Sequence, residues 1–218
     1  MQMKNMYGHL AVTLLGLATM IAVPLAAYER ELTSLQVRHA VFLGRANNAR
    51  TASFLKDYLQ TFPAARSGVY LSRVEVSTPY KQIVERARRA ASGSYSALQA
   101  QSDYELSPRR LLLDLTFLRA LATPPQPSRA MPVLISESPL DFLQGFTYGV
   151  AQSGREVPAF IQVIDGIYNC GPWGCFLTGV RVQLAAEVAA VESAPLDLEV
   201  AAADGQIVRA RFDLARLR

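Results

Sequence analysis

The N-terminal segment from Asn5 to Tyr28 contains no Asp, Glu, Lys or Arg. Lys4 precedes it, and charged residues resume at Glu29. A helix rises about 1.5 Å per residue, so about 20 apolar residues are enough to cross a hydrocarbon layer about 30 Å thick. The sequence therefore predicts one transmembrane helix over residues 5–28, which contacts the lipid bilayer and holds the rest of the chain at the membrane.

A cleaved secretory signal peptide is the main alternative for this segment. Such a peptide has a basic start, an apolar core of about 7–15 residues and small residues at its cleavage site. Here the apolar run is longer, and cleavage after Ala27 would place Leu25 where a small residue is needed. The pattern therefore favours an uncleaved anchor over a cleaved signal, and also over a buried helix of a soluble protein.

Two opposing signals indicate the side of the membrane on which the C-terminal part lies. Arg30, Arg38 and Arg45 follow the segment while only Lys4 precedes it, and this count alone places the C-terminal part in the cytoplasm. Large domains cross membranes largely regardless of such charges, however, and paired cysteines are typical of exported proteins. We therefore expect the anchor in a bacterial inner membrane, with the domain in the periplasm.

The composition after residue 28 limits the class of partner. The chain has 218 residues, and the 190 that follow the anchor are enough for one sizeable core or two small ones. These residues include 21 basic and 18 acidic side chains, and the two signs are interspersed. Such a balance does not indicate nucleic acid as a partner.

Residues 29–63 are predicted to form a membrane-proximal helical stalk. Mostly apolar side chains recur there at alternating spacings of three and four residues, the pattern of a helix that packs along one face. They are Leu32, Leu35, His39, Phe42, Ala46 and Ala49. Asn47 and Asn48 could divide the segment into two helices, of which the second packs on the globular part and ends before Pro63.

Residues 64–218 are predicted to form an α+β domain dominated by an antiparallel sheet, either sandwich-like or curled. Alternating apolar and polar residues mark most of the strands, and Leu111, Leu113, Leu115 and Phe117 give the clearest case. The expected strands are 68–76, 110–119, 131–136, 159–168, 176–188, 196–201 and 206–214. Residues 140–150 are ambiguous between strand and loop. A turn signal at residues 203–206 joins the last two strands as a hairpin.

One helix is expected to pack on this sheet, and it begins at Thr78 and Pro79. Thr can cap the free amides of a first turn, and Pro at the first helical position loses no hydrogen bond. The helix, which extends to about residue 91, would bury Ile83, Val84, Ala87 and Ala91. Its basic side consists of Arg86, Arg88 and Arg89. We interpret these arginines as a solvated face, with anionic lipid headgroups or an acidic partner as the alternative contacts.

The short motif that is most informative about chemistry contains both cysteines of the chain, Cys170 and Cys175, and lies between two predicted strands. Pro172 and Gly174 suit a type I turn, which would place the cysteines opposite each other within reach of a disulfide. A redox pair normally has Cys-x-x-Cys spacing, and a metal site would need further ligands, so a structural disulfide is favoured over these and over free thiols. Such a bond would present Trp173 and Pro172 as contact residues, unless Trp173 folds back over the sheet.

The sequence carries no catalytic signature. It contains no Gly-x-Ser-x-Gly motif, no phosphate-binding glycine loop and no His-x-x-x-His pair. The carboxylate pairs Asp103/Glu105 and Asp197/Glu199 have the two-residue spacing that is typical of the solvated face of a strand. We therefore expect no enzyme activity, no cofactor and no metal ion.

These patterns together predict a non-catalytic accessory or scaffolding subunit of a larger bacterial membrane complex, such as an energy-transducing or transport assembly. Its partners would be other membrane proteins of that complex. The alternative is an exported binding module that works alone on a peptide, glycan or small ligand.

Overall fold

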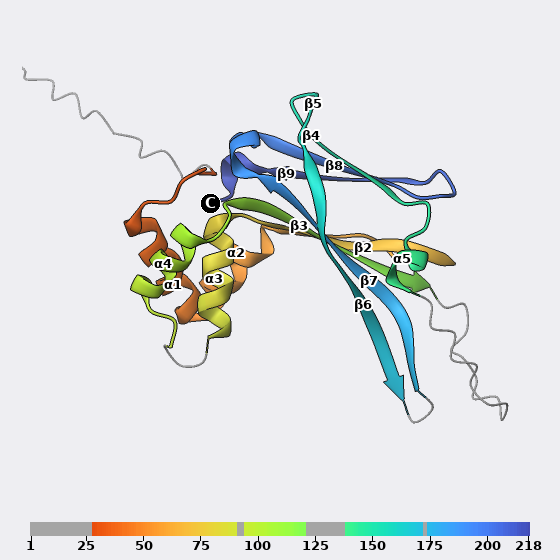
Figure 1. Ribbon diagram of the computed structural model, residues 1–218, viewed down its shortest axis with the longest axis horizontal. Coiled ribbons are helices and arrows are strands. Elements are labelled where there is room, and N and C mark those ends of the chain that lie inside the picture. Colours follow the sequence, from red (N-terminus) through yellow and green to blue (C-terminus); the bar gives the residue numbers. More distant parts are fainter. Residues whose placement is uncertain (1–27, 91–93, 121–137, 172–173) are drawn as a thin grey trace, which may run out of the picture.

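The computed structural model describes residues 28–90, 94–120, 138–171 and 174–218, and these form an α+β fold with antiparallel sheets and a group of helices (Figure 1). The predicted transmembrane segment lies outside these ranges except for Tyr28, and the strand expected at 131–136 lies outside them entirely. Within the described ranges, no helix combines the length and apolar character needed to span a bilayer.

The strands form two antiparallel sheets. The first has the order β1 (Leu59–Thr61), β2 (Gly68–Ser77), β3 (Arg110–Ala120), β7 (Gly174–Glu187) and β6 (Ala159–Gly171). The second has the order β5 (Arg155–Glu156), β4 (Thr147–Gln152), β8 (Pro195–Ala201) and β9 (Ile207–Asp213). The predicted strands within the described residues are confirmed, with ends that differ by at most three residues. The ambiguous stretch 140–150 contains the end of helix α5 (Pro139–Phe142) and the start of β4.

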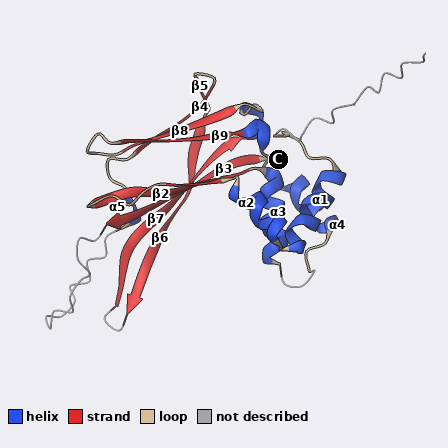
Figure 2. Ribbon diagram, turned by 180° about the vertical axis from the view of Figure 1, so that it is seen from behind, coloured by secondary structure: helices blue, strands red, loops and turns tan. Residues whose placement is uncertain are grey.

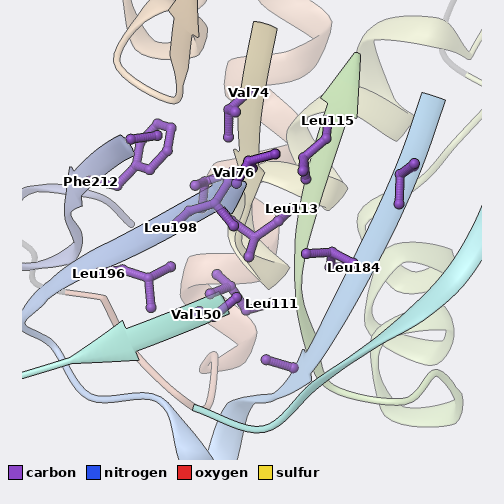
Figure 3. Close-up of a cluster of buried hydrophobic side chains, with 14 of the residues drawn as sticks. Val74, Val76, Leu111, Leu113, Leu115, Val150, Leu184, Leu196, Leu198 and Phe212 are labelled. Atoms are coloured by element: carbon purple, nitrogen blue, oxygen red, sulfur yellow. The ribbon is translucent and has the colours of Figure 1, made fainter. Parts of the chain in front are cut away.

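The main core lies between the two sheets. Leu111, Leu113, Leu115 and Phe117 on β3 are each 0% exposed, as their alternation predicts. Figure 3 shows side chains of β2, β3 and β7 directed toward those of β4, β8 and β9. Full burial of one such side chain contributes roughly 1.5–3 kcal/mol. The first sheet therefore has one face that the second sheet covers and one outer face that carries polar residues.

The helices pack together beside the sheets and form a second core (Figure 2). They are α1 (Ser34–Ala46), α2 (Ala49–Lys56), α3 (Pro79–Arg89) and α4 (Ala97–Leu106), and two short 3-10 turns lie at Val188–Ala190 and Leu214–Arg216. The predicted start of α3 is confirmed, because the Thr78 hydroxyl accepts a hydrogen bond from the Lys81 amide at 3.2 Å. Ile83, Val84 and Ala87 are buried, as expected, and Ala91, for which burial was also predicted, lies outside the described residues.

The face of α1 that packs differs from the predicted one. Leu35 and Phe42 are 72% and 63% exposed, and the buried face consists of Val37, Ala40, Val41 and Gly44. Both sets of residues have helical spacing, but the small side chains of the second set allow α1 to approach α3 closely. A Cβ atom added at Gly44 would lie 2.3 Å from the carbonyl oxygen of Val84. Helix α1 therefore packs against α3 and α4 and does not stand apart as a stalk.

Asp103 and Glu105 lie on helix α4, so the prediction that they share the solvated face of a strand was wrong. The Ser96 hydroxyl caps the helix by accepting a hydrogen bond from the Gln99 amide. Only Ala100 and Tyr104 are buried along its length, so its apolar stripe is too sparse for periodicity to reveal it. By contrast, Asp197 and Glu199 lie on the solvated face of β8, as predicted.

The close approach at Gly44 gives a testable prediction. Gly-to-Ala in a helix normally stabilises by about 0.8–1.0 kcal/mol. Here we expect Gly44→Ala to lower the free energy of unfolding by about 1–2 kcal/mol, because overpacking forces α1 and α3 apart. Gly149→Ala is the control, since a Cβ there meets nothing within 4 Å. Chemical denaturation of both variants measures the difference, and a stabilised Gly44→Ala variant would contradict this packing.

Candidate functional site

Strands β6 and β7 form a hairpin that extends beyond the rest of its sheet. β7 pairs with β3 only as far as the Leu118–Gly179 pair. Beyond this point, β6 and β7 pair only with each other among the described residues, through to the Gly171–Gly174 pair. We call residues 167–171 and 174–178 the projecting hairpin. Its described end points away from the helices α1, α2, α3 and α4 (Figures 1 and 2).

The two cysteines lie directly opposite each other near the tip of the projecting hairpin. The Sγ atoms of Cys170 and Cys175 are 2.04 Å apart, which is a disulfide distance, as predicted. A two-stranded hairpin without neighbouring strands is marginally stable, and a covalent link helps to hold its strands together. The loop is short, so the gain is expected to be less than the roughly 3 kcal/mol of a 15-residue loop.

Trp173 and Pro172 lie outside the described residues, so their predicted contact role stays a prediction. Strand β6, which precedes these two residues in the chain, is described and has an exposed apolar surface. Among the described residues, β6 forms an edge of its sheet, and large apolar side chains along the whole β6–β7 strand pair are exposed to solvent. They are Phe160 (45%), Ile161 (48%), Val163 (37%), Tyr168 (53%) and Phe176 (47%).

Edge strands of natural proteins are usually protected from unwanted pairing by Lys, Pro, bulges or inward charges. β6 has 13 residues and carries no Lys or Pro, and Asp165 is its one charged residue. Two register shifts interrupt its pairing with β7, between Ile161 and Val163 and between Ile167 and Tyr168. The stretch between these shifts keeps a regular, weakly charged edge that a further strand can join.

A second feature lies on the outer face of the same sheet, where α3 forms a wall beside β2, β3 and β7. The hollow has a volume of about 450 Å³. Its lining residues are Arg73, Glu75, Ser77, Gln82, Glu85, Arg86, Arg88, Arg89, Leu112, Asp114, Arg181 and Gln183. We call it the arginine hollow. Glu75, Asp114 and Gln183 are neighbours across β2, β3 and β7 and form its floor.

A buried lysine joins the wall of the hollow to its floor. Lys81 is 1% exposed, and its Nζ donates to Glu75 Oε1 at 2.7 Å and lies 3.1 Å from Glu85 Oε1. Burial raises the pKa of Glu75, but the hydrogen bond and charge of Lys81, together with Arg73, outweigh it, so this pKa lies below its usual value. Lys81 therefore fixes α3 against β2.

The pKa of Asp114 is shifted in the opposite direction from that of Glu75. Burial raises the pKa of its carboxyl group above the usual value, although the Gln183 amide donates a hydrogen bond to it at 2.9 Å. Charged groups in such a floor are partly desolvated, so they respond more strongly to a nearby ligand charge than surface groups do. This makes the floor of the arginine hollow electrostatically distinct from the exposed sheet.

The arginines predicted as contact candidates line this hollow and differ in their partners. Arg86 pairs with Asp103 at 2.9 Å, and Arg89 lies 3.7 Å from Glu85. Arg88 has no ion-pair partner among the described residues. Sequence reasoning missed Lys81, which is the buried lysine of α3, and it missed the floor residues because these come from strands that are far apart in the chain. Alternating polar residues on β2, β3 and β7 were the only available signal.

The described part of the chain contains no group of three or more His, Cys, Asp or Glu residues that could hold a metal ion. Comparison with known proteins finds no matching family, no similar curated protein and no similar solved structure. A functional interpretation therefore rests on the projecting hairpin, the edge of β6 and the arginine hollow.

The Lys81 cluster predicts a specific pH dependence of stability. We expect Glu75→Gln to lower the free energy of unfolding at pH 7 by about 2–3 kcal/mol, because it removes one partner of a buried charge. The folded pKa of Glu75 is depressed, so its contribution is present above the unfolded pKa and is lost as the pH falls through the folded value. The difference between variant and wild type should therefore shrink at acid pH.

Glu199→Gln is the control for this experiment, because Glu199 forms an exposed ion pair with Arg209 at 2.8 Å. Exposed pairs contribute about 0–1 kcal/mol. Denaturation curves from pH 7 down to pH 3 measure both effects. A Glu75→Gln variant that is as stable as Glu199→Gln at pH 7 would show that Lys81 does not depend on this partner.

Proposed function

We propose that this chain is a non-catalytic accessory or scaffolding subunit of a larger bacterial membrane assembly, of the energy-transducing or transport kind. In this proposal residues 5–28 anchor it in the inner membrane, its domain lies in the periplasm, and the β6–β7 hairpin contacts a partner protein. The observation that supports the proposal is the set of exposed apolar side chains on the β6–β7 hairpin and the edge of β6, which has no neighbouring strand among the described residues.

Exposed aromatic side chains favour a protein as the partner. Phe160, Tyr168 and Phe176 are about half exposed and lie on the paired strands β6 and β7. Aromatic residues on a rigid support are typical anchors of protein interfaces, because they bury a large area at a small loss of side-chain entropy. An extended segment of the partner can also add to the free edge of β6 by main-chain hydrogen bonds.

The direction of the hairpin agrees with a membrane anchor at the other end of the domain. Tyr28 is buried, and its amide donates a hydrogen bond to the carbonyl oxygen of Leu214 at 3.0 Å. Leu214 lies close to the C-terminus, which is marked beside the helices in Figure 1. A chain that enters the domain there would hold the projecting hairpin away from the bilayer, where a periplasmic part of a partner could reach it.

An exported binding module that works alone is the second candidate. The arginine hollow favours it, because a polar concave surface with several convergent side chains is typical of a ligand site. The two candidates differ in which surface is essential, so one experiment can separate them.

Site-specific photo-crosslinking in the native membrane tests the proposed contact. A photo-crosslinking amino acid replaces Phe160, Tyr168 or Phe176 in the full-length chain, and Ile207 serves as the control. Ile207 is 51% exposed and lies on β9, an edge of the other sheet. We expect a discrete adduct of higher mass from the hairpin positions and none from position 207.

A second variant makes the result specific to the edge of β6. Val163→Arg should reduce the adduct from position 160 at least about tenfold, since it places a charge inside the contact, whereas Ile207→Arg should leave it unchanged. Absence of any adduct from all three hairpin positions, or equal adducts from position 207, would count against the hairpin as the partner surface.

A further inference from the structure

Two guanidinium groups of the arginine hollow form no ion pair among the described residues, although Arg181 acts on the charge of Asp114. Five arginines and three carboxylates line it. The carboxylates already have partners, because Glu75 and Glu85 contact Lys81, and Asp114 accepts from Gln183. Arg88 on α3 and Arg181 on β7 form no ion pair among the described residues, although both line the same hollow.

The acidic side chains at the rim of the hollow do not fully balance its positive charge. Asp103 pairs with Arg86, and Asp165 lies opposite Arg181 in the register of β6 and β7. Counting Lys81 with the five arginines, six basic side chains stand in or beside the hollow against five acidic ones. One positive charge therefore remains in excess around the hollow, where Arg88 and Arg181 are exposed to solvent and can reach an anion.

The geometry favours a phosphate group over a carboxylate. The two oxygens of a carboxylate match the fork of a single guanidinium, whereas a phosphate has enough oxygens to accept from two forks at once. Arg88 belongs to the helix wall and Arg181 to the sheet, so a ligand that contacts both needs several acceptor oxygens. A hollow of about 450 Å³ also leaves room for an organic substituent beside the phosphate.

We infer that the arginine hollow binds the phosphate group of a small phosphate ester, either free in solution or as a lipid headgroup, with Arg88 and Arg181 as its contacts. Ser77, Gln82 and Gln183 line the same hollow. The amide nitrogens of both glutamines already donate within the protein, so the Ser77 hydroxyl and the glutamine carbonyl oxygens are the groups that can bond to the substituent. This site is separate from the proposed partner contact on the hairpin and does not depend on it.

Two probes with the same headgroup distinguish the two sources. Glycerol 3-phosphate is titrated by calorimetry into the full-length chain in a nonionic detergent at fixed ionic strength. Dioleoyl phosphatidic acid is added to the same protein and counted by native mass spectrometry, with dioleoylglycerol as the phosphate-free control. Tighter binding of glycerol 3-phosphate assigns a soluble ligand, and selective retention of phosphatidic acid assigns a lipid.

Three variants test the two contacts. Arg88→Gln and Arg181→Gln should each weaken binding of the preferred probe about tenfold, as expected for loss of one charge-assisted bidentate contact. Arg209→Gln, which changes an arginine on β9 of the other sheet and outside the hollow, should stay within about twofold, since screening limits its influence at that distance. Denaturation curves verify that all three variants are folded.

The inference is overturned if neither probe binds the wild-type protein, or if dioleoylglycerol is retained as well as phosphatidic acid. It is also overturned if Arg88→Gln and Arg181→Gln bind like the wild type, or if Arg209→Gln loses as much affinity as they do. Equal binding of succinate at the same ionic strength would show a general anion site and would reject phosphate as the specific ligand.

Discussion

The pairing of β3 with β2 on one side and β7 on the other determines the positions of both surface features. The inner side chains of β3 are fully buried against the second sheet, so the outer side chains of the same strand must tolerate water. Asp114 is one of these, and it lies in the floor of the arginine hollow. On the other side, β3 supports β7 only as far as Gly179, and the part of the hairpin beyond that point is free for contact.

Features that depend on neighbours in the chain could be predicted from the sequence. The alternation from Leu111 to Phe117, the helix start at Thr78 and the opposition of Cys170 and Cys175 each follow from a local pattern. Features that depend on distant neighbours could not. The prediction of which face of α1 is buried was wrong. Two faces of this helix have suitable spacing, and only the contact with α3 decides between them. The floor of the hollow was not predicted either, because Glu75 and Gln183 come to lie on either side of Asp114 only through the order of the strands.

The two surface features have different chemistry but share one sheet. Val163 on the exposed edge pairs in register with Gln183 in the hollow, and the guanidinium of Arg110 lies 5.0 Å from the ring centroid of Phe160. A partner strand added to β6 would therefore lie beside the hollow without covering its α3 wall. This arrangement allows one domain to hold a protein partner and a small anion on adjacent surfaces.

The central claim is that the edge of β6 is covered by a partner when the chain is in its assembly. Hydrogen–deuterium exchange over Ala159–Gly171 tests this most directly, in the full-length chain within its native membrane assembly and after purification from it. The account predicts that amides of β6 exchange at least about tenfold more slowly in the assembly, while those of the β9 edge do not change. Equal exchange of β6 in both states, with new protection elsewhere on the domain, would contradict it.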